Sequence, residues 1–131
     1  VGLLAAMTDL DAKTLLMGNA IFTEFKGALT EQYICQQLYA ELDMVPYYWS
    51  AEASSGEVDF VLQYRGQVVP LEVKAEENLN AKSLKSFVNT YQLAYGVRTS
   101  MSDYREQEKL VNLPLYAISL LWEVCDKMNE A

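Results

Sequence analysis

Two carboxylates and an amine in the middle of the chain have the types and spacing needed for metal-dependent hydrolysis. Glu72 follows Asp59 by thirteen residues, and Lys74 lies two residues beyond Glu72. Carboxylate oxygens are ligands that Mg²⁺ prefers, and a bound Mg²⁺ or Mn²⁺ lowers the pKa of a water and stabilises charge on a phosphodiester. A lysine beside them could orient that water or neutralise a pentacovalent transition state. The three residues therefore predict metal-dependent hydrolysis of phosphodiester bonds.

A β-hairpin over residues 56–74 would position these three side chains. Runs of Val, Phe, Leu and Tyr flank Arg65-Gly66, a pair typical of two-residue hairpin loops. With that loop, Asp59 lies directly opposite Glu72, with Cβ atoms roughly 5 Å apart, and the two like charges repel. Lys74 shares their face because strand side chains alternate. A cation or a proton would relieve the repulsion.

A purely structural interpretation of the hairpin stays open. In it, Asp59 and Glu72 are solvated strand residues, and Glu57 forms a cross-strand ion pair with Lys74.

A helix expected over residues 23–42 could supply a third carboxylate. Glu31 lies within its apolar stripe, so a helix would bring this side chain toward the inward side. The alternative is that Glu31 lies at the edge of the stripe and reaches water or pairs with Lys26. The stripe consists of Leu29, Ile34, Cys35, Leu38 and Leu42.

A second helix, expected over residues 83–93, begins among residues that could contact a phosphate. The free amides and the dipole at a helix N-terminus favour anions. An ordinary capped and solvated helix start is the alternative. The candidate phosphate contacts are Lys82, Ser83, Lys85 and Ser86.

The remaining patterns predict a mixture of helices and strands. We expect a short helix within residues 1–20, strands over 47–50 and 95–99, a polar loop over 101–109, and a final helix with Pro114 near its first turn. The sequence therefore predicts an α+β fold in a single domain over residues 1–131. The chain begins with Val1 in an apolar pattern and without an initiator Met, so we expect it to be a piece of a longer polypeptide.

The composition excludes several other chemistries. The chain has no histidine and two cysteines, which excludes His-based triads and the usual Cys/His zinc sites. Cys35 and Cys125 fall in apolar helical patterns, so we expect reduced core thiols. No apolar run reaches the roughly 20 residues that span a bilayer, and no secretory signal is visible, which predicts a cytoplasmic protein without membrane association.

The charge balance argues against strong autonomous DNA binding. The 131 residues include 18 acidic and 10 basic ones, a net charge of −8. Lys and Arg supply most of the non-specific affinity for nucleic acid because they neutralise phosphates.

The spacing of the candidate site resembles a known signature. Asp59 and Glu72-Val73-Lys74 resemble the D…(D/E)-x-K motif of the restriction-endonuclease-like PD-(D/E)xK nuclease superfamily, with Val58 where its name has Pro. Glu31 resembles the helix glutamate that many members place before the hairpin.

Ordered blocks resemble more closely the uncharacterised C-terminal domain of prokaryotic AAA+ family ATPases. The resemblance runs from about Phe25 to Tyr116. The blocks are Phe25 to Gln32, Tyr48-Trp49, Gly56 to Phe60, Pro70 to Lys74, and Ser83 to Phe87, and Asn112 to Tyr116 fits the closing segment.

The resemblance implies a three-layer fold in which helices flank a central mixed sheet with a hairpin. It implies Glu31, Asp59, Glu72 and Lys74 as catalytic residues, with the three carboxylates as ligands of Mg²⁺ or Mn²⁺. It also implies an upstream AAA+ ATPase domain in the same polypeptide. ATP would bind only there, because this chain contains no G-x-x-x-x-G-K-[ST] motif.

Two functions follow as hypotheses. The first is an Mg²⁺-dependent DNA endonuclease module attached to the ATPase. The second is a non-catalytic binding or assembly module that uses the same fold to regulate or oligomerise the ATPase.

Overall fold

Six strands form one mixed β-sheet that carries the candidate site. The computed structural model describes residues 20–49, 58–75 and 81–131. The strand order is β1-β2-β3-β4-β6-β5, antiparallel from β1 to β3, parallel from β3 through β4 to β6, and antiparallel between β6 and β5. The strands are β1 (Tyr47–Trp49), β2 (Val58–Tyr64), β3 (Gln67–Val73), β4 (Gly96–Ser100), β5 (Arg105–Gln107) and β6 (Leu110–Pro114).

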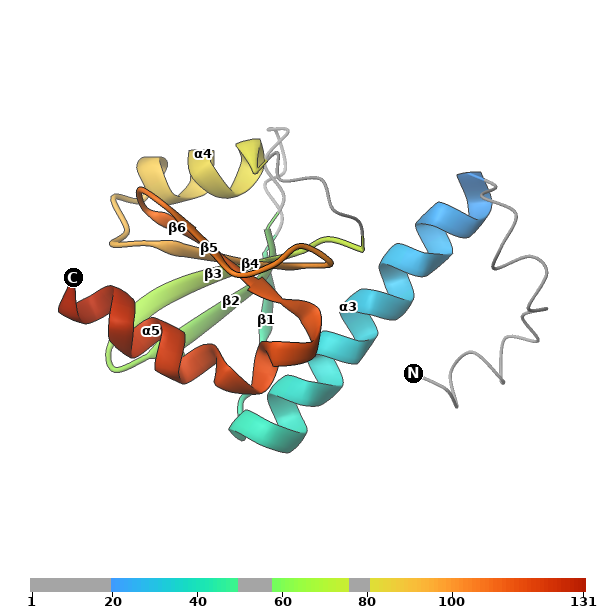
Figure 1. Cartoon of the computed structure of the whole chain (residues 1–131), viewed down its shortest axis with the longest axis horizontal. Coiled ribbons are helices and arrows are strands. Elements are labelled where there is room, and N and C mark those ends of the chain that lie inside the picture. The colour runs from blue at the N-terminus through green and yellow to red at the C-terminus, as the bar shows by residue number, and fades with distance from the viewer. Residues whose placement is uncertain (1–19, 50–57, 76–80) are drawn as a thin grey trace.

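Helices cover both faces of this sheet. One face is covered by α4 (Lys82–Thr90), and the other by α3 (Ala20–Leu42), the 3₁₀ helix η1 (Leu115–Leu120) and α5 (Leu121–Glu130) (Figure 1). The first part of α3 extends past the edge of the sheet (Figure 1). The structure is therefore a mixed α+β fold in three layers, as expected. No helix in the described part of the chain is long and apolar enough to cross a membrane.

The hairpin has the expected loop and register. Phe60 lies opposite Leu71, and Tyr64 lies opposite Gln67, which leaves Arg65 and Gly66 in the turn. Both turn residues have positive φ, 48° and 77°, as the type I′ turn that matches strand twist requires. One further step in this register brings Asp59 opposite Glu72.

The main core lies between the sheet and the layer of α3, η1 and α5. Ile34 and Leu38 of α3 are fully buried there against the inward residues of the hairpin. The apolar stripe predicted for this helix is confirmed at its centre, whereas Leu29, Cys35 and Leu42 are only half-buried. The α3 face of the hairpin is formed by Phe60, Leu62, Val69, Leu71 and Val73.

Other expectations need adjustment at their ends. The strand expected over 47–50 is β1, and Ser50 lies outside the described residues. The strand expected over 95–99 is β4, and the helix expected over 83–93 is α4. The helix expected within residues 1–20 also lies outside the described residues, apart from Ala20 at the start of α3.

One expectation near the C-terminus is wrong, and another needs refinement. The polar segment 101–109 contains β5, an exposed edge strand whose residues bury neither face and so show no apolar alternation. The final helix that was expected with Pro114 near its first turn is present in two parts. Pro114, the last residue of β6, directly precedes the 3₁₀ helix η1, and the α-helical part starts only at Leu121.

Candidate functional site

Asp59 and Glu72 are neighbours at the end of the hairpin. The backbone N–H of Val73 donates a hydrogen bond to Oδ2 of Asp59 over 2.6 Å. The charge of Asp59 also raises the pKa of Glu72, although burial is the larger cause. The hairpin therefore brings the two carboxylates together as the register predicts.

Glu72 has one satisfied oxygen and one unsatisfied oxygen. Its residue is 3% exposed, and Oε1 lies 3.2 Å from Nζ of Lys74. Oε2 is buried and accepts no hydrogen bond from the residues that the structure describes. Burying an unsatisfied carboxylate oxygen is costly, so this atom has an unused capacity to bind a cation or a proton.

Lys74 connects the buried carboxylate to the surface. Its backbone N–H donates to the carbonyl oxygen of Thr99 over 2.9 Å, which fixes the chain just beyond β3. Its side chain is 43% exposed while its ammonium contacts Glu72. The Lys74 side chain is therefore accessible from solvent while its ammonium is held by Glu72.

Glu31 is not part of a three-carboxylate group with these residues. Within residues 20–49, 58–75 and 81–131, no three His, Cys, Asp or Glu side chains gather closely enough to hold a metal ion. Glu31 is half-buried on α3 near Tyr48 of β1. Partial desolvation, then Cys35 and the charge of Glu31, raise the pKa of the exposed Tyr48. The role of Glu31 as a ligand stays a prediction. Glu57, its proposed pairing with Lys74 included, lies outside the described residues.

The two remaining carboxylates suit a hard divalent cation. Mg²⁺ is usually held by one or two carboxylates, with water and substrate phosphate as the other ligands. Asp59 and Glu72 meet that requirement, and the unsatisfied Oε2 of Glu72 is the atom best placed for it. The residues therefore fit the metal that the motif implies.

Arg98 was not predicted as a site residue. It lies opposite Glu72 in the parallel pairing of β3 and β4, and opposite Asn112 in that of β4 and β6. It is 4% exposed, and its Nε donates to Oδ1 of Asn112 over 3.2 Å. Its Nη1 is buried and donates to no described residue. The available signal in the sequence was a charged residue, Arg98, between Val97 and Thr99 in a predicted strand.

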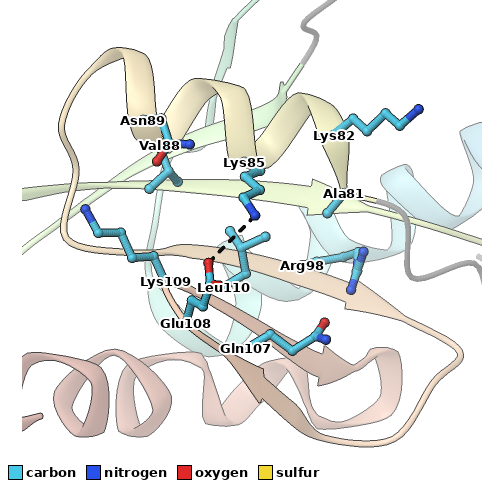
Figure 2. Close-up of a pocket in the computed structure, with 10 residues that line it drawn as sticks. All are labelled: Ala81, Lys82, Lys85, Val88, Asn89, Arg98, Gln107, Glu108, Lys109 and Leu110. Carbon is cyan, nitrogen blue, oxygen red and sulfur yellow. Dashed lines mark ion pairs between the residues drawn. The ribbon is translucent and has the colours of Figure 1, made fainter.

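A pocket lies beside Arg98, between α4 and strands β4, β6 and β5 (Figure 2). Its volume is about 650 Å³. Lys82 and Lys85, two of the predicted phosphate contacts, line it, whereas Ser83 and Ser86 are not part of the lining. The other lining residues are Ala81, Val88, Asn89, Arg98, Gln107, Glu108, Lys109 and Leu110.

The start of α4 is not capped by a side chain. Ala81 occupies the N-cap position, where no side-chain hydrogen bond is made. The side-chain cap in the alternative interpretation is therefore wrong, because the serines follow the cap position instead of occupying it. The solvated start in that interpretation agrees with the exposure of Lys82, Lys85 and Ser86.

Comparison with known proteins identifies a family and leaves its activity open. The chain matches no curated protein and no solved structure. A family model described as "Domain of unknown function (DUF4143)" matches residues 26–118, which is well over half of the chain and includes the hairpin, α4 and the pocket. The chain therefore belongs to the DUF4143 family of domains of unknown function.

Proposed function

We propose that this domain is a metal-dependent DNA endonuclease module with a restriction-endonuclease-like fold, attached to an AAA+ ATPase. The observation that carries the proposal is the pair Asp59 and Glu72, with Oε2 of Glu72 buried and unsatisfied among the described residues and Lys74 held 3.2 Å from Oε1. The three layers and the hairpin agree with that fold.

Each residue has a distinct task. Asp59 and Glu72 would hold the divalent cation, and Asp59 is oriented by the N–H of Val73. The bound cation would acidify a water and stabilise charge on the phosphodiester. Lys74, whose side chain is 43% exposed and whose ammonium contacts Glu72, could hold a phosphate oxygen and neutralise charge that develops there.

The test is a cleavage assay with matched carboxylate variants. Supercoiled, linear and branched DNA is incubated with the protein and Mg²⁺ or Mn²⁺, and calorimetry measures metal binding. Asp59→Asn and Glu72→Gln should each lower the cleavage rate at least about a hundredfold, as loss of a main electrostatic group does. Lys74→Met should lower cleavage with little change in metal affinity.

Glu123→Gln is the matched control, because Glu123 is an exposed carboxylate on α5. It should leave both readouts unchanged. Cleavage that survives Asp59→Asn and Glu72→Gln would assign the activity elsewhere. Absence of both cleavage and metal binding would reject the nuclease.

A second function is favoured by exposed aromatic residues at the edge of the sheet. Tyr47 and Tyr48 of the edge strand β1 are 66% and 71% exposed, and Tyr39 of α3 is 52% exposed. Such residues are enriched at protein interfaces. In this alternative the domain is an assembly module. Tyr47→Ser with Tyr48→Ser should then reduce self-association or ATPase association in light scattering, without changing the fold.

A further inference from the structure

The pocket beside α4 gathers positive charge in an otherwise acidic chain. Four of the ten Lys and Arg residues line it, namely Lys82, Lys85, Arg98 and Lys109, against one carboxylate, Glu108. The net charge of −8 therefore does not describe this surface. Local concentration of cations, and not the total, determines where a phosphate can bind.

Arg98 points to an anion as the ligand of this pocket. The residue is 4% exposed, it forms part of the pocket wall, and its Nη1 has no acceptor among the described residues (Figure 2). A buried cation is costly unless acceptors surround it. An arginine also suits phosphate because its planar donors match two phosphate oxygens.

The start of α4 adds a second source of positive potential. Ala81 is the N-cap and provides no side-chain hydrogen bond to the first amides of this nine-residue helix. Lys82 and Arg98 lie toward one end of the pocket, and Lys109 lies toward the other (Figure 2). Because Arg98 is opposite Glu72, the first end adjoins the carboxylate pair.

The middle of the pocket is spanned by an ion pair that a ligand would have to open. Nζ of Lys85 lies 3.7 Å from Oε2 of Glu108, and the two side chains are 61% and 81% exposed (Figure 2). An exposed pair of this kind is worth less than about 1 kcal/mol, so a phosphate can compete for Lys85. Glu108 therefore acts against anion binding.

We propose that this pocket binds a phosphate group of a nucleic-acid strand, next to the phosphodiester that is held at Asp59 and Glu72. The volume of about 650 Å³ accommodates a nucleotide. The assignment of a strand as the source of the phosphate rests on the proposed nuclease function. Phosphate binding itself does not.

The test measures binding without catalysis. The full chain is titrated, in EDTA, with a fluorescein-labelled single-stranded DNA of about ten nucleotides, a length in the usual range for such sites. Inorganic phosphate and a nucleoside monophosphate are titrated separately. Lys85→Gln and Lys82→Gln should weaken binding about two- to fivefold each. Glu108→Gln should strengthen it by a similar factor, a gain that an unfolded variant could not give.

Lys26→Gln is the matched control, because Lys26 is an exposed lysine on α3, a helix none of whose described residues lines the pocket. It should leave the affinity unchanged. Equal losses of DNA affinity in Lys26→Gln and Lys85→Gln would contradict phosphate binding in this pocket. An unchanged affinity in Glu108→Gln would contradict it as well. If the variants change the affinity for free phosphate or nucleotide but not the affinity for the DNA, the ligand of the pocket is not a nucleic-acid strand.

The two proposals fail separately. Asp59→Asn should lower cleavage at least about a hundredfold. It should not weaken DNA binding in EDTA, because without a metal it only removes a negative charge from the side of the strand. If DNA binding shows the expected changes among the variants but the unmodified protein does not cleave DNA, nuclease activity is rejected and phosphate binding in the pocket is retained. If the protein cleaves DNA and neither Lys85→Gln nor Glu108→Gln changes the KM, phosphate binding in the pocket is rejected and nuclease activity is retained.

Discussion

Glu72 and Arg98 lie opposite each other in the parallel pairing of β3 and β4, and both side chains are almost completely buried. Burial lowers the pKa of Arg98, and the charge of Glu72 counteracts that effect. The pair joins the carboxylates at the hairpin to the cationic pocket under α4. Two buried charged residues on neighbouring strands therefore connect the two candidate sites.

The stability of the protein should depend on the ionisation of Glu72. Burial chiefly, and Asp59, raise its pKa, while Lys74 and Arg98 oppose the shift. The folded chain thus holds this proton more tightly than the unfolded chain. Ionised Glu72 destabilises the fold near neutral pH, and this destabilisation is relieved as the pH falls through the raised pKa and is gone below the ordinary pKa of about 4.3.

Urea unfolding of the wild type and Glu72→Gln over a series of pH values checks this expectation. The wild type should lose free energy of unfolding relative to Glu72→Gln as the pH rises. A difference that is constant with pH, or that has the opposite slope, contradicts the raised pKa.

Asn112 should be the residue that holds Arg98 in place. Its Oδ1 accepts from Nε of Arg98 over 3.2 Å and from Oγ of Ser100 over 2.7 Å. Its Nδ2 donates to the carbonyl oxygens of Ser102 and Asp103 over 3.1 and 2.9 Å. Asn112→Ala leaves several buried groups unsatisfied, and it should lower the free energy of unfolding by about 2–4 kcal/mol.

Chemical denaturation measures this loss, and exposed Asn89→Ala is the control, expected within about 0.5 kcal/mol of the wild type. Asn112→Asp offers a second readout, because the aspartate keeps an oxygen that can accept from Arg98 and adds a negative charge beside it. Since this charge opposes an anion, the variant should weaken phosphate binding. Unchanged binding and stability in these variants would show that Arg98 is held by other contacts.

Gly96 should set the distance between α4 and the sheet. A Cβ at this position would lie 2.8 Å from Cγ2 of Val88 and 3.0 Å from Cδ1 of Leu84. Gly96→Ala therefore overpacks the contact and should destabilise the protein by about 1–3 kcal/mol. Val88→Ala in the same chain removes the closest atom and should recover part of the loss.

A double-mutant cycle in urea measures this coupling. If the changes in the free energy of unfolding caused by Gly96→Ala and Val88→Ala are additive, the close contact between position 96 and Val88 is contradicted. Because α4 forms one wall of the pocket, Gly96→Ala should also reduce phosphate affinity.

The hairpin turn should tolerate substitution unequally at its two positions. Gly66 has φ of 77°, which a β-branched residue adopts only under strain, so Gly66→Val should cost about 1–3 kcal/mol. Arg65 has φ of 48°, which asparagine adopts readily. Arg65→Asn loses the surface ion pair with Asp126 (3.1 Å) and should change stability by less than about 1 kcal/mol. Thermal unfolding compares the two variants, and equal losses would contradict the type I′ turn.

The two free cysteines should differ in reactivity. Cys125 is fully buried, and burial raises its pKa to about 11, which lowers its thiolate fraction about a hundredfold relative to an ordinary thiol. Cys35 is half-buried. In the native state near pH 8, a thiol reagent should modify Cys35 first and Cys125 only with global unfolding. Mass spectrometry after timed quenching identifies the site, and early labelling of Cys125 would contradict the packing of α5.

Local sequence patterns were sufficient to predict the hairpin and the residues that it brings together. The Arg65-Gly66 turn determines the register, and the register alone brings Asp59 and Glu72 together, because paired strands allow no other arrangement of alternating side chains. The stripe of α3 was readable for the same reason, since a helix with one buried side shows a period that a sequence displays. Edge strand β5 has no buried face and therefore left no such pattern.

The sequence by itself determined the pairing of the two carboxylates, their neighbour Lys74 and the helices and strands with a periodic buried face. Only the tertiary structure decided which distant residues join them. Arg98 meets Glu72 because β4 pairs in parallel with β3, Asn112 meets Arg98 through β6, and four cations gather because α4 packs across these strands. Contacts between strands that are separated by a crossover depend on global strand order, which no local spacing specifies.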